Sequence, residues 1–227
     1  MSENRSILLK NVKKQYNGRT ILDIEDLSFE KGKIYAILGL NGSGKTTLLR
    51  ILAGLERQDS GDVRCEGSIA FLAQEIYLFD MTVASNMKTA IGKTETSLAV
   101  IKDAIEKVNM TDFYHKRTQS MSGGEKQRIA IARTLAQKRE IVLLDEPTAY
   151  VDMASTALVE NYMKEMQRET QATMLFTTHN PSQALRIANE VVILWDGIPI
   201  EQGPSGQVLH HPEHEMTRRF LSDWRLD

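Results

Sequence analysis

The sequence has little of what marks secreted or membrane-spanning chains. Cys65 is the single cysteine among 227 residues, which excludes an internal disulfide framework and fits a reducing compartment. No apolar run approaches the roughly 18–20 residues that a membrane helix needs. The first ten residues carry an acid and lack a long apolar stretch, so we expect no secretory signal there. We therefore expect a chain of the cytosol without a membrane span of its own.

A surplus of charge of one sign is also missing. The chain holds 28 Lys and Arg against 30 Asp and Glu, a formal net charge of -2. This near-balance argues against nucleic-acid binding by bulk charge. Hydrophobic residues make up 41% of the chain, which is ample for a core, and the length predicts one domain or one core with a lobe attached.

Proline is absent from the first 146 residues, so few breaks interrupt the early elements. Strands alternate with helices, which predicts an α/β fold, and a more polar, mainly helical stretch at 76–120 is expected to form a separate lobe. The tail after Pro204 is expected to be helical only near its end, and its His210, His211 and His214 are expected to be solvated rather than a metal site. The expected strands lie near 7–12, 21–29, 34–38, 69–72, 141–144, 174–176, 191–195 and 198–200, and the expected helices near 48–55, 122–135 and 153–169.

Residues 39–46 form a glycine-rich loop between an apolar strand and an apolar helix, and they match G-x-x-x-x-G-K-[ST]. Amides of such a loop surround phosphate oxygens, and the helix N-terminus adds partial positive charge. Lys45 would supply a full charge to the β- and γ-phosphates, and Thr46 a hydroxyl to Mg²⁺. The spacing does not fit the dinucleotide pattern G-x-G-x-x-G. The candidate nucleotide-binding residues here are Gly39, Asn41, Gly42, Ser43, Gly44, Lys45, Thr46 and Thr47.

An apolar strand at 141–144 leads directly into Asp145 and Glu146. The carboxyl ends of parallel strands meet at one edge of a sheet, so we expect both acids beside the phosphate loop. Adjacent strand residues point to opposite sides, so the two acids are expected to have different tasks. Asp145 would hold Mg²⁺, directly or through water, and Glu146 would polarise the attacking water as general base.

The stretch Ser122-Gly123-Gly124-Glu125 matches a capping box before an apolar helix. Two glycines weaken a first helical turn, but they let an anion approach the backbone closely. One nucleotide cannot easily occupy two phosphate-binding helix starts within one small domain. A head-to-tail pair, in which this helix start reaches the nucleotide of the other subunit, resolves the conflict; an ordinary helix cap is the alternative.

All these motifs occur together and in order, with Leu143-Leu144-Asp145-Glu146-Pro147-Thr148 and Thr177-Thr178-His179 completing the set. In this combination the chain resembles the nucleotide-binding subunit of ATP-binding cassette (ABC) transporters, from about residue 6 to its C-terminus. The resemblance implies a P-loop ATPase core with a mainly parallel sheet, an N-terminal antiparallel β subdomain and an inserted helical subdomain. The implied boundaries within a single domain, 1–227, are about 1–74 and 136–227 for the core and about 75–135 for the helical signature subdomain.

The resemblance also implies roles for single residues. Tyr16 stands where the family places an aromatic that stacks on adenine, and Asp152 resembles an aspartate of the dimer interface. The implied catalytic residues are Glu146, the switch histidine His179, and Gln74, which would contact Mg²⁺ and the attacking water. The implied metal ligands are Thr46, Gln74 and Asp145, and Ser122, Gly123 and Gly124 would close on the γ-phosphate across a dimer. The sequence departs from the residues that the family often has at four positions of these motifs: Met121, Glu125, Tyr150 and Val151.

The same resemblance implies hydrolysis of ATP, with Mg²⁺ as cofactor, by a homodimer at the cytoplasmic face of the inner membrane. The implied partners are integral membrane permease subunits and an extracytoplasmic solute-binding protein, and nucleic acid is not among them. Stretches 77–86, 179–186 and 217–221 resemble bacterial importers, the last two those of phosphate and tungstate type. The alternatives are a short exporter cassette of the lipoprotein-release type and a non-transport cassette of iron–sulfur assembly or DNA repair.

Overall fold

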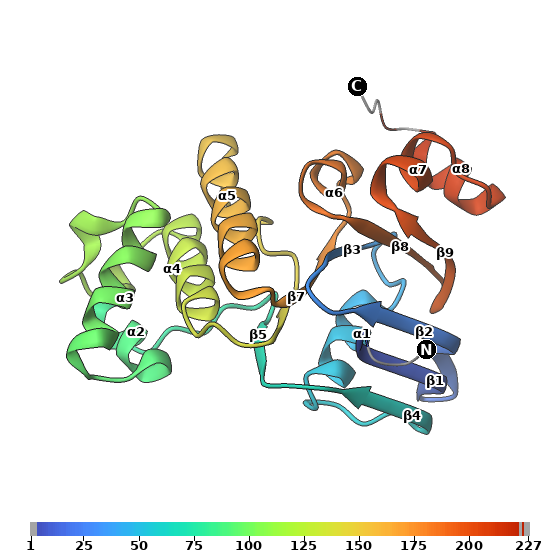
Figure 1. Ribbon diagram of the computed structural model, residues 1–227, viewed down its shortest axis with the longest axis horizontal. Coiled ribbons are helices and arrows are strands. Elements are labelled where there is room, and N and C mark those ends of the chain that lie inside the picture. The colour runs from blue at the N-terminus through green and yellow to red at the C-terminus, as the bar shows by residue number, and fades with distance from the viewer. Residues whose placement is uncertain (1–3, 223, 225–227) are drawn as a thin grey trace.

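The computed structural model describes residues 4–222 and 224, which form two sheets flanked by helices (Figure 1). A three-stranded antiparallel sheet has the order β2-β1-β4, and a six-stranded sheet has the order β5-β6-β7-β3-β8-β9. Neighbours in the larger sheet are parallel except for β8 and β9. The strands are β1 (Arg5–Tyr16), β2 (Arg19–Glu30), β3 (Ile34–Leu38), β4 (Ser60–Cys65), β5 (Ile69–Leu72), β6 (Ile141–Leu144), β7 (Thr173–Thr178), β8 (Glu190–Trp195) and β9 (Ile198–Pro204).

Helices α2, α3 and α4 lie together at one end of the molecule, and the three-stranded sheet lies at the other (Figure 1). Across residues 4–222 and 224, no helix combines the length and apolar character that crossing a membrane requires. The helices are α1 (Lys45–Leu52), α2 (Val83–Ile91), α3 (Glu95–Lys107), α4 (Gly123–Leu135), α5 (Met153–Thr170), α6 (Pro181–Ile187), α7 (Ser205–His210) and α8 (Glu215–Leu221).

The larger sheet separates two hydrophobic cores. Successive residues of a strand point to opposite faces, and β3 shows this directly: Ala36 packs into the core that also holds the helical end, whereas Ile37 packs into the core shared with α1 and the smaller sheet. All residues of β3 and β6 are buried, as expected for parallel strands that are covered on both faces. Burial on both faces explains why these segments are continuous apolar runs.

The parallel order brings the ends of four strands to one edge. Strands β6, β7 and β3 are neighbours, and β5 pairs with β6. The loop after β3 is the glycine-rich loop, β6 runs into Asp145, β7 runs into His179, and β5 is followed by Gln74. Segments that are far apart in the sequence therefore meet because of strand order alone.

Two expectations about secondary structure were wrong or incomplete. The tail is helical directly after Pro204, because α7 buries Val208 and Leu209 against the rest of the fold. The sequence did not indicate this helix, because two apolar residues are too few to show a helical period. Strand β4 was not expected, because it is mostly polar and only Val63 and Cys65 are half-buried. It forms by pairing with β1, which is a tertiary contact that local pattern does not reveal.

Candidate functional site

The glycine-rich loop owes its path to two glycines that no other residue could replace. A Cβ on Gly39 would lie 2.3 Å from the carbonyl oxygen of Leu194, and one on Gly44 would lie 2.7 Å from that of Ile21. Gly44 also has a φ of +98°, a region that glycine adopts without strain. Within the described chain, no side chain caps the start of α1, so its first amides are open to an anionic ligand.

Lys45 is folded back onto this loop. Its Nζ donates to the carbonyl oxygens of Gly39 at 2.8 Å and Leu40 at 3.0 Å. Burial lowers the pKa of Lys45, and the charges of Glu146 and Asp145 oppose that shift. A buried cation needs a charged partner to offset its desolvation, and a phosphate group beside the loop would supply one.

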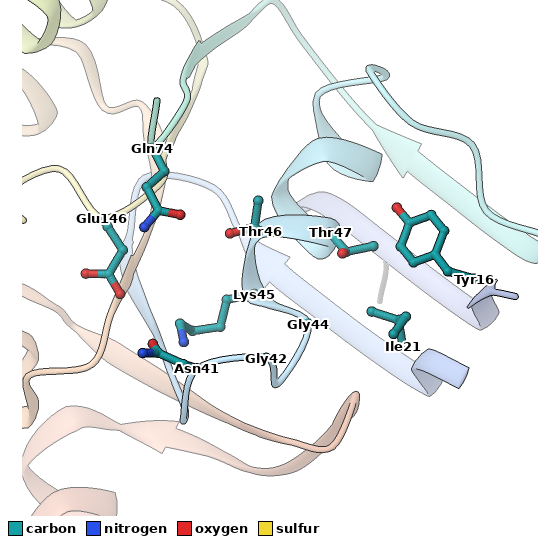
Figure 2. A pocket seen from close by; sticks show the side chains of 10 residues that line it. All are labelled: Tyr16, Ile21, Asn41, Gly42, Gly44, Lys45, Thr46, Thr47, Gln74 and Glu146. Atoms are coloured by element: carbon teal, nitrogen blue, oxygen red, sulfur yellow. The ribbon is translucent and has the colours of Figure 1, made fainter. Parts of the chain in front are cut away.

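A pocket of about 400 Å³ extends from the loop to the smaller sheet (Figure 2). Gln74 and Glu146 face Lys45 and Asn41 at one end of this pocket, and Tyr16 lies at the other end (Figure 2). Ile21, which sequence reasoning did not include in the site, lies beside Tyr16 (Figure 2), because β2 turns back along β1 and Tyr16 pairs with Arg19. The lining residues are Tyr16, Ile21, Asn41, Gly42, Gly44, Lys45, Thr46, Thr47, Gln74 and Glu146.

The two acids differ in burial. Asp145 is 1% exposed, and its Oδ1 accepts a 2.7 Å hydrogen bond from the hydroxyl of Thr177. Its Oδ2 is buried and lacks a hydrogen-bond partner among the residues described. Glu146 instead lines the pocket, and its Oε1 atom lies 3.3 Å from the Nδ1 atom of His179. Its φ of +47° breaks the strand geometry directly after β6.

These residues fit a magnesium ion. Mg²⁺ takes oxygen ligands, commonly one or two carboxylates together with substrate phosphates. The unpartnered, buried Oδ2 of Asp145 is an oxygen that a metal ion or its water would satisfy. Thr46 and Gln74 offer further oxygens from the wall of the same pocket. The donor set therefore suits a hard cation.

Tyr16 is held by a contact that the sequence did not indicate. Its hydroxyl donates to the carboxylate of Glu56, which raises the pKa of Tyr16. The ammonium of Lys14 lies 5.2 Å from the ring centroid and within 3.4 Å of Glu56. Tyr16 as a whole residue remains 43% exposed, so it keeps surface against which a flat ligand can stack.

Eight predicted site residues are not among the lining residues of this pocket. Gly39, Ser43 and Asp145 lie within two residues of lining residues in the sequence, and His179 contacts Glu146. The other four, Ser122, Gly123, Gly124 and Asp152, belong to separate helix starts. Ser122 and Glu125 complete a capping box, with hydrogen bonds of 3.3 Å and 2.7 Å. Asp152 caps α5 by accepting from the amide of Ser155 at 2.9 Å, and this bond lowers its pKa. Within one chain, the second helix start is therefore not joined to the glycine-rich loop.

Comparison with known proteins identifies a matching family and several relatives of the chain. A family model described as ABC transporter matches residues 22–149, more than half of the chain. The chain is 33% identical, over 95% of its length and 98% of the relative's, to a probable sulfate/thiosulfate import ATP-binding protein, CysA, of Chlorella vulgaris. It is 37% identical, over 84% of its length and 95% of the relative's, to the tungstate uptake system ATP-binding protein TupC of Peptoclostridium acidaminophilum.

A solved structure agrees with these sequence matches. An ABC transporter assigned to the metal-chelate type, in an inward-facing conformation, aligns with a TM-score of 0.78 at 29% identity, over 91% of this chain and 86% of that chain. The predicted P-loop α/β fold and the predicted family are both confirmed by these matches. The chain therefore belongs to the ABC transporter family, of which it is a nucleotide-binding subunit.

Proposed function

We propose that the chain binds ATP with Mg²⁺ and hydrolyses it to power solute import. One observation supports this most directly: the glycine-rich loop with Lys45, the glutamine Gln74 and the acid Glu146 line a single pocket (Figure 2). A phosphate-binding loop alone would serve a nucleotide-dependent switch. The nearby carboxylate, which lies beside His179, adds a group that can take a proton from water.

The proposed chemistry assigns each residue a task. Loop amides, the start of α1 and Lys45 hold the phosphates, and Tyr16 stacks on adenine. Thr46, Asp145 and Gln74 would hold Mg²⁺, which neutralises charge on the β- and γ-phosphates when it is bound. Glu146 accepts the proton of the attacking water, and His179 orients Glu146 and contacts the γ-phosphate. Positioning and fixed charge then provide most of the rate enhancement.

The two helix starts that lie apart from the pocket, Ser122-Gly123-Gly124 and Asp152, are proposed to act across a homodimer. Ser122 and Gly123 are exposed at the start of α4, and a Cβ on Gly123 would meet nothing within 4 Å. This open helix start suits the γ-phosphate of ATP held by the partner subunit. Asp152 would work at the same interface. Closure around two ATP molecules and reopening after hydrolysis would form the power stroke.

A groove between the sheet and the helical end is the proposed docking surface for permease subunits. It has a volume of about 460 Å³, and the exposed rings of Tyr77 and Phe79 stack edge to face at 5.1 Å on its wall. Arg133 of α4 donates to the carbonyl of Tyr77 at 2.8 Å, so the groove links the segment after Gln74 to α4. Exposed aromatic rings beside a cation are typical of interaction surfaces.

The wider assembly is proposed from relatives and from the groove together. The core would comprise about 1–74 and 136–227, and the signature subdomain about 75–135. The subunit would sit at the cytoplasmic face of the inner membrane, with permease subunits and an extracytoplasmic solute-binding protein as partners. The relatives named for sulfate and tungstate import support an importer of a small solute or oxyanion over the exporter and non-transport alternatives.

The test is phosphate release by the purified full chain with ATP, in the presence of Mg²⁺ and in excess EDTA. We expect hydrolysis only with Mg²⁺. Cross-linking from Tyr77→Cys, in membranes that contain the assembly, should capture an integral membrane protein, whereas Ile198→Cys on β9, which is also exposed, should not. Absence of Mg²⁺-dependent hydrolysis would contradict the proposed activity.

A further inference from the structure

One buried hydroxyl contacts both members of the acid pair. Thr177, near the end of β7, is fully buried. Its Oγ1 accepts from the backbone amide of Glu146 at 2.8 Å and lies 2.7 Å from Oδ1 of Asp145. A hydroxyl has a single proton, and the amide of Glu146 already donates to the oxygen. The proton of Thr177 is therefore directed at the Asp145 carboxylate.

This bond decides which oxygen of Asp145 is available. Oδ1 is engaged by Thr177, whereas Oδ2 is buried and has no partner within the described part of the chain. With one oxygen anchored, the carboxylate cannot rotate freely about its terminal torsion. The free oxygen is therefore held in one orientation. Hydrogen bonds to metal ligands have the same effect in known metal sites, where they orient the ligand toward the metal.

The same hydroxyl supports the backbone of Glu146. This residue has a φ of +47°, in the left-handed region that few non-glycine residues adopt. Such conformations persist only where surrounding contacts hold them. The bond from the Glu146 amide to Thr177 lies at the point where the chain leaves β6, and the side chain that follows lines the pocket beside His179.

We propose that Thr177 is a positioning residue. Its one hydroxyl orients the Asp145 carboxylate toward Mg²⁺ and holds the backbone of Glu146 so that its side chain faces the attacking water. The inference rests on the proposed ATPase function and goes beyond it, because Thr177 is not among the residues that line the pocket. A purely structural threonine would support folding only. The two roles differ in one readout, the coupling of nucleotide affinity to Mg²⁺.

The experiment compares Thr177→Val, which keeps the shape and removes the hydroxyl, with Thr177→Ser, which keeps the hydroxyl. Thr173→Val is the matched control at the other end of β7, because the Thr173 hydroxyl is also buried and also bonds on two sides, to Ser6 at 2.9 Å and the amide of Gly32 at 3.2 Å. Calorimetry would measure ADP binding by the full chain with Mg²⁺ and in EDTA. Mg²⁺ titration of phosphate release would measure the half-saturating concentration.

We expect Thr177→Val to raise the half-saturating Mg²⁺ concentration about 10- to 100-fold, the range for partners of metal ligands. ADP binding should weaken with Mg²⁺ and stay unchanged in EDTA, and kcat should fall. Thr177→Ser should behave as wild type, and Thr173→Val should lower the melting temperature alone. If Thr177→Val does not fold, Thr177→Ala is measured in the same way.

The proposal is overturned if the valine or alanine variant keeps the Mg²⁺ enhancement of ADP affinity, or if Thr173→Val loses it equally. These outcomes are distinct from failure of the proposed function. A wild-type chain without Mg²⁺-dependent hydrolysis would contradict the ATPase assignment. An active wild type, together with a Thr177→Val variant whose ADP affinity still rises with Mg²⁺ as in the wild type, would contradict only the positioning role.

Discussion

The side-chain amide of Gln127 donates to the carbonyl oxygen of Pro147 at 2.8 Å, and both residues are buried. Gln127 lies on α4, whose start carries Ser122, and Pro147 directly follows Glu146. A second close contact lies nearby, because a Cβ on Gly124 would be 2.9 Å from the carbonyl of Tyr150. The helix that is proposed to reach the partner's nucleotide is therefore attached to the segment that follows the proposed general base.

Gln127→Met keeps the length of this side chain and removes the donor, which leaves a buried carbonyl without its partner. That loss costs about 1–3 kcal/mol, and in a chain of this size about 2–4 °C of melting temperature per kcal/mol. Thermal unfolding followed by circular dichroism would measure it. Gln137→Met, just beyond the end of α4, is the control, because the Gln137 amide bonds only weakly, at 3.4 Å to Arg133. Equal melting temperatures for both variants would contradict this account.

The sequence predicted most of the site because its parts lie at strand ends. The spacing of Gly39, Gly44 and Lys45 requires a strand before it and a helix after it, and parallel strands then bring Asp145 and His179 to the same edge. The argument does not depend on how many residues separate these segments in the sequence. Continuous apolar runs indicate parallel strands that are buried on both faces, whereas the strand order comes from the structure.

Other parts of the site depend on pairing between side chains that no local pattern encodes. The Thr177 hydroxyl meets Asp145 across 32 residues, and Glu56 meets Tyr16 across 40. Threonine in a buried strand is ordinary, and glutamate after a helix is typical of a surface. Only the register of β6 against β7 brings the first pair together. The second pair requires the loop after α1 to return to the end of β1.

Acidification should loosen the C-terminal helices. Burial alone would raise the pKa of the Glu201 carboxyl, but the nearby Thr217 hydroxyl and the amides of Glu213 at 2.9 Å and His214 at 3.2 Å favour its charged form, and its pKa is lowered. A depressed carboxyl pKa stabilises the fold above the unfolded pKa, and that stability is lost as pH falls through the folded pKa. Glu201→Gln should therefore lower the melting temperature at neutral pH, and progressively less as the pH falls below 4.5, the usual pKa of a glutamate carboxyl. The exposed Glu213→Gln is the control; a gap between wild type and Glu201→Gln that stays constant with pH would refute the linkage.

Glu146→Gln should nearly abolish turnover, because the amide cannot accept the proton of water; loss of a general base costs about 10²- to 10⁴-fold. Nucleotide-binding groups stay intact, so ATP should accumulate in a stable dimer. Phosphate release and light scattering with Mg²⁺ and ATP would measure both effects. Glu140→Gln, directly before β6, is the matched control, since its carboxylate accepts hydrogen bonds from the Ser68 amide and hydroxyl and does not line the pocket. Wild-type turnover in Glu146→Gln would falsify the assignment of the base.

Two inactive variants should restore activity to each other if the site is shared between subunits. Ser122→Arg places a bulky cation on the exposed helix start and should block the partner's site, whereas Lys45→Ala removes the phosphate cation of its own site. In a mixed dimer, the Lys45 of one chain faces the intact Ser122 of the other, so one composite site is complete and the second lacks both groups. We expect each variant alone to be nearly inactive and their mixture to hydrolyse ATP. Adding chain that carries both substitutions to either variant is the control, since no complete site can form. Normal hydrolysis by Ser122→Arg alone, or no recovery on mixing, would show that each subunit works by itself.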